Sequence, residues 1–471
     1  MRKLGGKGDL RTLLFCVLAG WLLASSVAAQ PQQQEQMPDL QKPITLDQAL
    51  EIAFRQSPTI KVALAQIQRS QATVAEARAN FLPKFNGEVI QQWQGPKVAF
   101  VAPGTTKELD IMPASDTRAN ASVLLPLDIN NRLSFTTQIA RYQNEIDYLN
   151  LRSISQQLIF DVKSAYYNVL RAMGQEEVAQ AAVDAANARL REANVRFTAG
   201  TAPKFDVTRA QVDVANLNQS LIQAKARVAT AISALNRVLG IDVNFPTQVV
   251  KNTVAIEDVK VDIPKSVEQA QTLRPEVMSL ERLIRLNQTN ARLQRTGVMP
   301  SLNATGQVTY DVKASGFSTS NTSWIAMLDL KIPIWDGGIT AARVAQAYAD
   351  ANKATEQLEE TKLLVALQTR TAALNLQEAI ERVSTADANV ALAEEALRLA
   401  SVRYEAGVAT LVEVTDAEAA LTQAKTNAVN ARYDYAVALA DLQRATSTQP
   451  EVQKLQLLCP QFVTAKSSSG K

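Results

Sequence analysis

The sequence has no histidine and only two cysteines among its 471 residues. Without imidazole, the chain lacks the commonest general base and the commonest metal ligand of proteins, which argues against a catalytic triad and against a zinc site. Paired carboxylates could still hydrolyse glycosides, but they need a cleft that the organisation described below does not offer. We therefore expect a protein that is not an enzyme and that holds no metal or other cofactor.

An excess of charge of one sign is also missing once the N-terminus is set aside. Residues 1–29 combine basic residues, an apolar run and the small residues Val27-Ala28-Ala29, which is the pattern of a secretory signal peptide. Cleavage would remove four basic residues and Asp9, and so cancel the net charge of +3 carried by the whole chain. A near-neutral mature chain argues against a nucleic-acid partner.

Paired cysteines and long apolar runs are the next absences. Cys16 lies in the predicted signal peptide, so Cys459 would have no partner for an intramolecular disulfide. Cys16 also lacks the small-residue context of a lipidated cysteine, and we expect no lipid anchor. After the signal, no apolar run reaches the ~20 residues that a spanning helix needs.

Two halves of the chain repeat one another. The hexapeptide from Arg196 to Thr201 matches the one from Arg403 to Val408, 207 residues later. Leu125-Pro126-Leu127 and Ile332-Pro333-Ile334 match at the same separation. Leu82-Pro83 and Met299-Pro300 are instead 217 residues apart, so ten extra residues lie in the first half, in the loop around 95–116. Anchors in the same order, with one insertion, indicate an internal duplication.

Proline and glycine are almost absent from two long stretches. Residues 131–199 contain no proline and one glycine, Gly174, and residues 339–406 contain neither. Both stretches are rich in good helix formers, so each predicts a helix of about 100 Å. Each ends at an Ala-Gly pair and is followed by a second helical stretch, which gives helical hairpins at 131–239 and 339–445. Hairpins alone favour a structural rod as much as a tunnel.

Four shorter segments alternate between apolar and polar residues, as β-strands with one apolar face do. They lie at about 84–95 and 117–127 in the first half, and at about 301–313 and 323–334 in the second. Half-buried strands of soluble proteins alternate in the same way, but two matched pairs in an exported chain without a spanning helix favour a membrane β-barrel. Four strands cannot close a barrel around an open channel, so the chain must assemble; the residues allow two, three or four copies.

The duplicated order of helices, paired strands, long helix, glycine turn and helix resembles the TolC family of outer-membrane efflux proteins over residues 44–447. The most specific matches are the turns at 196–200 and 403–407, with the strand exits Leu-Pro-Leu and Ile-Pro-Ile-Trp-Asp-Gly-Gly. The resemblance implies a mostly α fold with a β-barrel portion. In a homotrimer, the duplicated long helical hairpins would form a periplasmic α-barrel, and four strands per protomer would contribute to a 12-stranded transmembrane β-barrel.

The same resemblance implies a passive exit duct in the lipid of the outer membrane, with its helical part in the periplasm. Such a duct works with a periplasmic membrane-fusion adaptor and with an inner-membrane pump of the RND or ABC type, in efflux or in type I secretion. The alternative from the residues alone is a periplasmic coiled-coil scaffold or adaptor without a pore. An adaptor would be expected to carry a lipoyl-like β domain, and no such segment is evident in the sequence.

The resemblance also assigns roles to residues near the two turns. Glu413 and Asp416 match acidic positions that line the pore constriction, and Asp206 and Tyr404 match positions that tie neighbouring hairpins shut. Where the family carries an arginine, this chain has Ala409, so we expect a different closed-state network with Lys204 as a substitute contact. Helix capping is the alternative role for the three acidic residues.

The exposed tips of the two hairpins would contact the adaptor. These residues are Gly200, Thr201, Gly407 and Val408, for which a simple role in the turns is the alternative. The observations together divide the chain into a signal peptide at 1–29, a polar disordered leader at 30–43, a first repeat at 44–240, a connector at 241–264, a second repeat at 265–447, and a C-terminal segment with a disordered tail at 448–471.

Overall fold

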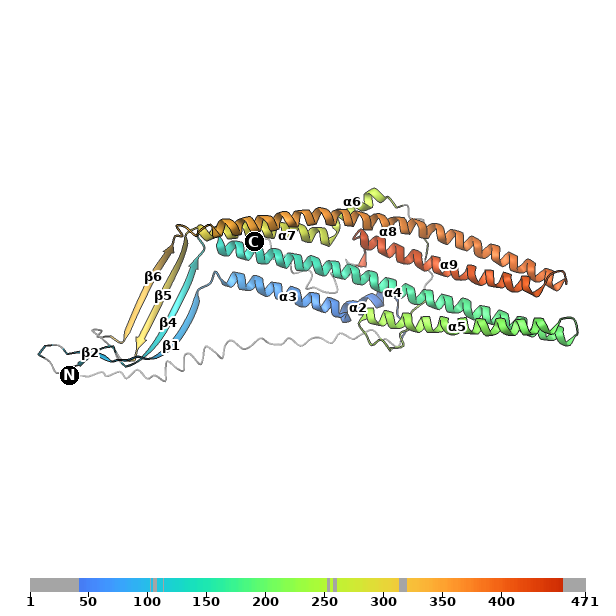
Figure 1. The fold of residues 1–471 in the computed structure, drawn as a ribbon, viewed down its shortest axis with the longest axis horizontal. Helices are drawn as coiled ribbons and strands as arrows, with labels where there is room; N and C mark the ends of the chain where they lie inside the picture. The colour runs from blue at the N-terminus through green and yellow to red at the C-terminus, as the bar shows by residue number, and fades with distance from the viewer. Residues whose placement is uncertain are drawn as a thin grey trace. The chain divides into compact units, whose positions relative to one another are not determined.

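The computed structural model describes residues 42–101, 103–104, 108–112, 114–251, 255–256, 261–312 and 320–451. The predicted signal peptide at 1–29, nearly all of the predicted leader at 30–43 and most of the predicted C-terminal segment at 448–471 lie outside the described residues. The described part is mostly helical and contains a four-stranded and a two-stranded sheet (Figure 1). None of its helices combines the length and the apolar character needed to span a membrane.

The first half of the chain begins with two helices and ends with a long hairpin. Its helices are α2 (Leu46–Gln56), α3 (Pro58–Ala79), α4 (Arg132–Thr198) and α5 (Lys204–Leu239). Thr45 and Gln48 form a capping box that fixes the start of α2, because each side chain bonds to the backbone N–H of the other. Pro58 begins α3, where its missing N–H costs no hydrogen bond.

The second half repeats this plan. Its helices are α6 (Ile263–Leu273), α7 (Pro275–Arg295), α8 (Ile339–Glu405) and α9 (Leu411–Ala445), with a short 3-10 turn, η1 (Thr296–Val298), after α7. Both α4 and α8 have 67 residues, and both begin after a residue with positive φ, Asn131 or Gly338. Within each half, the long helix packs against the helix that follows its turn (Figure 1).

The four-stranded sheet joins the two halves. It is antiparallel with the order β1 (Lys84–Trp93), β4 (Ser115–Leu127), β5 (Ser301–Asp311) and β6 (Thr322–Lys331). The last strand of the first half therefore pairs with the first strand of the second, and β1 and β6 form the two open edges (Figure 1). β6 ends at Lys331, three residues before the end that alternation predicts, because Pro333 has no N–H to continue the ladder.

A two-stranded sheet occupies the loop that carries the ten-residue insertion. β2 (Val98–Val101) pairs with β3 (Glu108–Met112), with an irregularity in register between Val98 and Ala99. We expected an irregular loop here, because the segment is rich in Pro, Gly, Thr and Asp. The short apolar run at 98–101 instead forms a strand, so the first half has four strands in its described residues and not two.

Side chains from α4 hold the start of the described chain and the connector together. Ile44 and Val249 form an isolated parallel bridge, and the buried Tyr166 hydroxyl lies 3.2 Å from the carbonyl oxygen of Ile44 and 3.0 Å from that of Val250. Burial raises the pKa of Tyr166 to about 12, so the hydroxyl remains a donor at any physiological pH. The connector between the repeats is thereby fixed to the first half.

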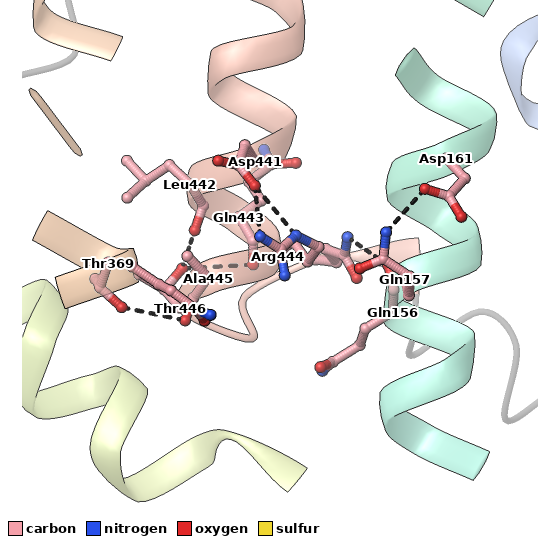
Figure 2. Close-up of polar contacts among 12 residues, drawn as sticks. Gln156, Gln157, Asp161, Thr369, Asp441, Leu442, Gln443, Arg444, Ala445 and Thr446 are labelled. Atoms are coloured by element: carbon pink, nitrogen blue, oxygen red, sulfur yellow. Dashed lines mark hydrogen bonds and ion pairs between the residues drawn. The ribbon is translucent and has the colours of Figure 1, made fainter. Parts of the chain in front are cut away.

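The chain turns back against α4 after α9 ends. Figure 2 shows this end, where Arg444 bonds to Asp441 Oδ1 at 2.7 Å and the Thr446 hydroxyl bonds to the carbonyl oxygen of Leu442 at 2.8 Å. Beyond the helix, Gln449 Nε2 donates to the carbonyl oxygen of Gln156 at 3.2 Å. The two halves are therefore in contact at the end of α9 as well as through the sheet.

Candidate functional site

The two hairpin turns have the same backbone geometry. Gly200 and Gly407 both have φ of +75°. Thr201 N donates to the carbonyl oxygen of Arg196 at 2.9 Å, and Val408 N donates to that of Arg403 at 3.0 Å. A Cβ added at either glycine would meet no atom within 4 Å, so backbone conformation and not space requires glycine. Gly200, Thr201, Gly407 and Val408, the predicted adaptor contacts, are all exposed.

Tyr404 and Arg196 connect the two hairpins near these turns. The Arg196 guanidinium carbon lies 4.5 Å from the centroid of the Tyr404 ring, and Tyr404 is only 9% exposed. Burial raises the pKa of the Tyr404 hydroxyl; Arg196 acts in the opposite direction, and the negative charge of Asp206 adds to the rise. The structure therefore brings together two of the predicted gate residues, Tyr404 and Asp206, and adds Arg196, which the sequence did not single out.

The other predicted gate residue, Lys204, lies at the first position of α5 and is exposed. Its carbonyl oxygen accepts a bond from the Thr208 hydroxyl, and no ion pair of its ammonium group is found within the described residues. Ala409 packs against the apolar cluster of Tyr404, Leu411 and Val414. This position therefore has an apolar role in the second hairpin, and Lys204 remains a proposed substitute contact only.

Glu413 and Asp416 lie one turn apart at the start of α9, and both are exposed. Glu413 Oε1 accepts a bond from the backbone N–H of Thr410 at 3.3 Å, which is half of a capping box, and Glu413 Oε2 lies 3.3 Å from Arg403 Nη1. Glu413 therefore has a structural role in this chain, whatever else it does. Within the described residues, no bond of the Asp416 side chain is found.

A charged cluster between the hairpins was missed by the sequence analysis. Arg189 of α4 pairs with Glu418 of α9, while Asp213 of α5 and Glu192 of α4 lie close enough to influence the Glu418 carboxyl. Burial raises the pKa of Glu418, the Arg189 guanidinium offsets part of the rise, and the two other carboxylates add to it. The sequence offers one signal for this cluster. Arg189 and Arg196 are seven residues apart and therefore lie on one face of α4.

This cluster belongs to a row of polar contacts that joins α4 to α9. Arg171 Nη1 lies 2.8 Å from Asp434 Oδ1, Gln175 Nε2 lies 2.6 Å from Asn430 Oδ1, and Lys163 Nζ lies 3.0 Å from Gln443 Oε1. The helices also approach closely at Gly174, where an added Cβ would lie 2.8 Å from Val429 Cγ1. Each hairpin, by contrast, has an apolar interior, such as the cluster of Ala193, Val207 and Ala210 in the first.

The two faces of the four-stranded sheet differ sharply in charge. The cross-strand register places every charged residue of the four strands on one face: Lys84, Glu88, Asp116, Arg118, Asp311, Asp329 and Lys331. The opposite face carries uncharged and mostly apolar residues, among them Phe85, Trp93 and Trp324, whose exposed fractions are 79%, 76% and 78%. An uncharged face of this kind is suited to contact with lipid.

The comparisons with known proteins agree with this geometry. The family model of the outer membrane efflux proteins matches residues 49–241 and 266–448. The chain is 28% identical to the outer membrane protein TolC of Escherichia coli (strain K12) over 321 residues, which cover 64% of either chain. It is 25% identical over 419 residues to the pyoverdine export outer membrane protein OpmQ of Pseudomonas putida, which covers 86% of either chain.

Solved structures extend the agreement to the fold. The outer membrane channel CmeC of Campylobacter jejuni superposes with a TM-score of 0.73 at 17% identity, over 87% of this chain and 88% of that one. The match to TolC spans slightly less than two thirds of that protein's length. The predicted fold class, with long helical hairpins and a four-stranded contribution to a barrel, is confirmed. Because the family model covers most of both halves, this chain belongs to the outer membrane efflux protein family, the TolC family to which its glycine turns and strand exits pointed.

Proposed function

We propose that three copies of this chain form a passive channel through the outer membrane, through which substrates leave the cell after delivery by a periplasmic adaptor and an inner-membrane pump. The observation that carries the proposal is the distribution of charge over the sheet. One face bears every charged residue of the four strands, and the other is uncharged and carries large apolar side chains that are exposed, chiefly on β1 and β6. The family to which the chain belongs is one of transport channels and not of enzymes.

The open edges of the sheet support assembly. An unpaired strand edge in lipid would leave each backbone polar group unbonded at a cost of several kcal/mol. β1 and β6 are both edges and run in opposite directions, so β6 of one copy can extend the antiparallel ladder to β1 of the next. Three copies would then give a closed barrel of 12 strands with the uncharged face toward lipid and the charged face toward the lumen.

The proposed entrance lies at the hairpin turns. Glu413 and Asp416 line the constriction and provide six carboxylates in a trimer, and Asp206, Tyr404 and Lys204 belong to the contacts that hold the entrance shut. The exposed tips Gly200, Thr201, Gly407 and Val408 receive the adaptor. Because the sequence contains no phosphate-binding glycine-rich motif, the energy for transport comes from the pump.

A planar bilayer tests the proposal. Purified mature protein should give stable single channels that prefer cations, because crowded carboxylates attract cations at the constriction. Replacing both residues, E413Q/D416N, should reduce the ratio of cation to anion permeability while conductance persists. If the wild-type protein gives no stable conductance, the channel function is rejected. If E413Q/D416N conducts with unchanged selectivity, the constriction role is rejected, and Glu413 is a capping residue alone.

The alternative, a periplasmic scaffold or adaptor without a pore, is not favoured. Such a protein would have no use for a sheet with an exposed uncharged face and two open edges. The relatives reported above are named as outer membrane proteins and channels. We propose drugs, metals or a secreted protein as the substrate classes of this chain. The name of OpmQ assigns that relative to pyoverdine export, which adds small chelators to the proposed classes.

A further inference from the structure

We propose that α8 of one copy packs against α5 of the next copy, over the sections of both helices that lie nearest the turns. The contact is made by a stripe of large apolar side chains on each helix and by opposite charges beside the stripes. The proposal rests on the proposed channel function and extends it, because it names the helical surface at which the copies of the trimer meet. The partner is thus a second copy of this chain.

The packing of the two hairpins leaves α5 and α8 on the outside of a row of four helices. α5 packs on α4, α4 on α9, and α9 on α8 (Figure 1). Near the turns, α4 and α9 each have a described helix of the row on two sides, whereas α5 and α8 each have one on a single side. Each outer helix therefore has a face that is open to a partner.

Large apolar side chains are exposed along one face of each outer helix. Spacings of seven, of three or of their sum keep side chains on one face of a coiled-coil helix, and both sets follow these spacings. The sets are Phe205, Val212 and Ile222 on α5, called the α5 stripe, and Leu392, Leu399 and Val402 on α8, called the α8 stripe, with exposed fractions from 49% to 71%. Exposed apolar side chains that gather on one face mark an interaction surface.

Both stripes point away from the chain's own hairpins. Ala210, five residues from Phe205, is buried against α4 in the interior of the first hairpin. Val383, nine residues from Leu392, is buried against α9 in the interior of the second. At about 100° per residue, these separations place the buried residues about 140° and 180° around their helices from the stripes. The stripes therefore take no part in holding either hairpin together.

The turns place the two stripes at matching levels. Phe205 follows the turn glycine Gly200 by five residues, and Val402 precedes Gly407 by five. The other stripe residues are 8, 12, 15 and 22 residues from their turn glycine and belong alternately to α8 and α5: Leu399, Val212, Leu392 and Ile222. Rotation about the axis of a closed barrel preserves the level along that axis. The stripe residues of one copy therefore lie between those of the next, as the side chains of packed helices do.

Opposite charges lie beside the stripes. α5 has 36 residues, of which five are basic and two acidic, a net charge of +3, whereas the equally long final section of α8 has four basic and six acidic residues, a net charge of −2. Lys225 and Arg227 lie 25 and 27 residues after Gly200, and Glu381 lies 26 residues before Gly407. All three are exposed, and no ion pair of any of them is found within the described residues. Charges that flank an apolar stripe select the partner helix, and these three lie at one level.

The open strand edges lead to the same arrangement of copies. β6 is followed by α8, and β1 is preceded by α3, which packs on α4 as α5 does (Figure 1). When β6 of one copy pairs with β1 of the next, α8 of the first copy meets the side of the second copy that carries α3 and α5. The contact between the helices thus continues the contact between the strands.

Cysteine pairs in the mature protein test the contact, in a Cys459→Ser background that leaves no other thiol. F205C/V402C joins residues at one level and should form, on mild oxidation in detergent, disulfide-linked species of two and three chains. F205C/L374C is the matched control, because Leu374 is exposed about five full turns of α8 before Leu392 and so lies on the same face. Its two cysteines differ in level by 28 residues, roughly 42 Å, and a disulfide needs Cα atoms within about 7 Å. This pair should remain unlinked.

Reversal of charge provides the second readout. E381K and K225E/R227E each place like charges at one level and should lower the temperature at which the trimer dissociates, measured by native mass spectrometry after heating. The combination E381K/K225E/R227E restores opposite charges and should recover most of the loss. Recovery on combining two damaging changes cannot arise from misfolding of the single copies.

The outcomes separate this surface from the channel itself. A trimer in which F205C/V402C gives no linked species, or in which the combined charge variant is no more stable than its two parents, overturns the contact and leaves the channel standing. In that case the stripes are open to another protein, such as the adaptor. A wild-type protein that is monomeric in detergent and gives no conductance overturns the channel as well.

Discussion

Arg196 lies over the ring of Tyr404, with its guanidinium carbon 4.5 Å from the ring centroid, and so joins the first hairpin to the second beside their turns. A cation over an aromatic face contributes about 0.5–1 kcal/mol at exposed sites and more when it is desolvated. Arg196→Met keeps most of the side-chain volume but removes the charge. We expect this variant to loosen the hairpin ends and to increase single-channel conductance.

The matched control for this prediction is Arg191→Met. Arg191 is an exposed arginine on the same helix, and no contact with the second hairpin is found for it within the described residues. Its replacement should leave conductance unchanged. Equal conductance in R196M and the wild type would show that the contact does not restrain the entrance.

Glu413 should stabilise the start of α9 through a hydrogen bond and an ion pair. Its Oε1 caps the start of α9 through Thr410 N, and its charge pairs with Arg403. Glu413→Ala removes both contributions and should destabilise the protein by about 1 kcal/mol, as the loss of an N-terminal cap does. Glu413→Gln keeps an acceptor oxygen and should cost less. Thermal unfolding of the detergent-solubilised protein measures both.

Asp416→Ala is the comparison for the cap. Asp416 has no side-chain bond in the described residues, so its replacement should leave the unfolding temperature near that of the wild type. A loss of stability in D416A as large as that in E413A would indicate that charge near the helix start, and not the hydrogen bond to Thr410, provides the stabilisation.

Glu276 should make the helical part sensitive to acid. Burial raises its pKa, but the hydrogen bond from the Ser153 hydroxyl and the nearby Arg274 guanidinium outweigh burial, and the net pKa is lower than the ordinary 4.5. A lowered pKa in the folded state stabilises the protein above pH 4.5, and this contribution is lost as the pH falls through the folded-state value.

Glu276→Gln tests this assignment. The variant should be less stable than the wild type at neutral pH, and the difference between the two should shrink as the pH falls below 4.5. Unfolding temperatures recorded across an acid pH series measure it. A difference that stays constant over the series would mean that Glu276 stabilises the fold by packing and not by charge.

Gly174 should be required because α9 lies close to α4 at this position, and not because of its backbone conformation. It lies inside α4, where glycine costs about 1 kcal/mol relative to alanine. A Cβ added there would lie 2.8 Å from Val429 Cγ1. Gly174→Ala should therefore fail to give the gain in stability expected of a better helix former, because Val429 must move.

Shortening Val429 to alanine should reveal the gain in stability that alanine gives at position 174. In G174A/V429A the new methyl group has space, so the double variant should unfold at a higher temperature than V429A alone. The interaction energy from this double-mutant cycle isolates the contact between α4 and α9. Additive effects of the two substitutions would show that the helices separate more readily here than the structure implies.

The sequence predicts features that depend on local chemistry. The turns at Gly200 and Gly407 were identifiable because positive φ selects glycine and because the duplication repeats it. Alternation identified the strands of the large sheet, since one face of each is apolar. It did not identify β2, whose four residues lie in a segment with the composition of a loop.

The sequence does not show which distant segments contact one another. Arg189 and Glu418 are 229 residues apart, and nothing in the periodicity of α4 states that it packs against α9. The same applies to Arg118, whose pairing with Asp311 depends on which strands become neighbours. Family resemblance indicated Asp206 and Tyr404, but only the structure showed that Arg196 completes their neighbourhood.

Polar contacts between α4 and α9 join one hairpin to the other, whereas apolar packing holds each hairpin together. These two kinds of interaction respond differently to dissolved salt. Ion pairs that are partly exposed, such as Arg171 and Asp434, are screened as ionic strength rises, since the Debye length is about 8 Å in physiological salt. The apolar interior of each hairpin is not weakened by screening. Added salt would therefore weaken the ion pairs between the hairpins while the interior of each hairpin stays intact, so the ionic strength of the surrounding fluid influences how firmly the two halves hold together along this row.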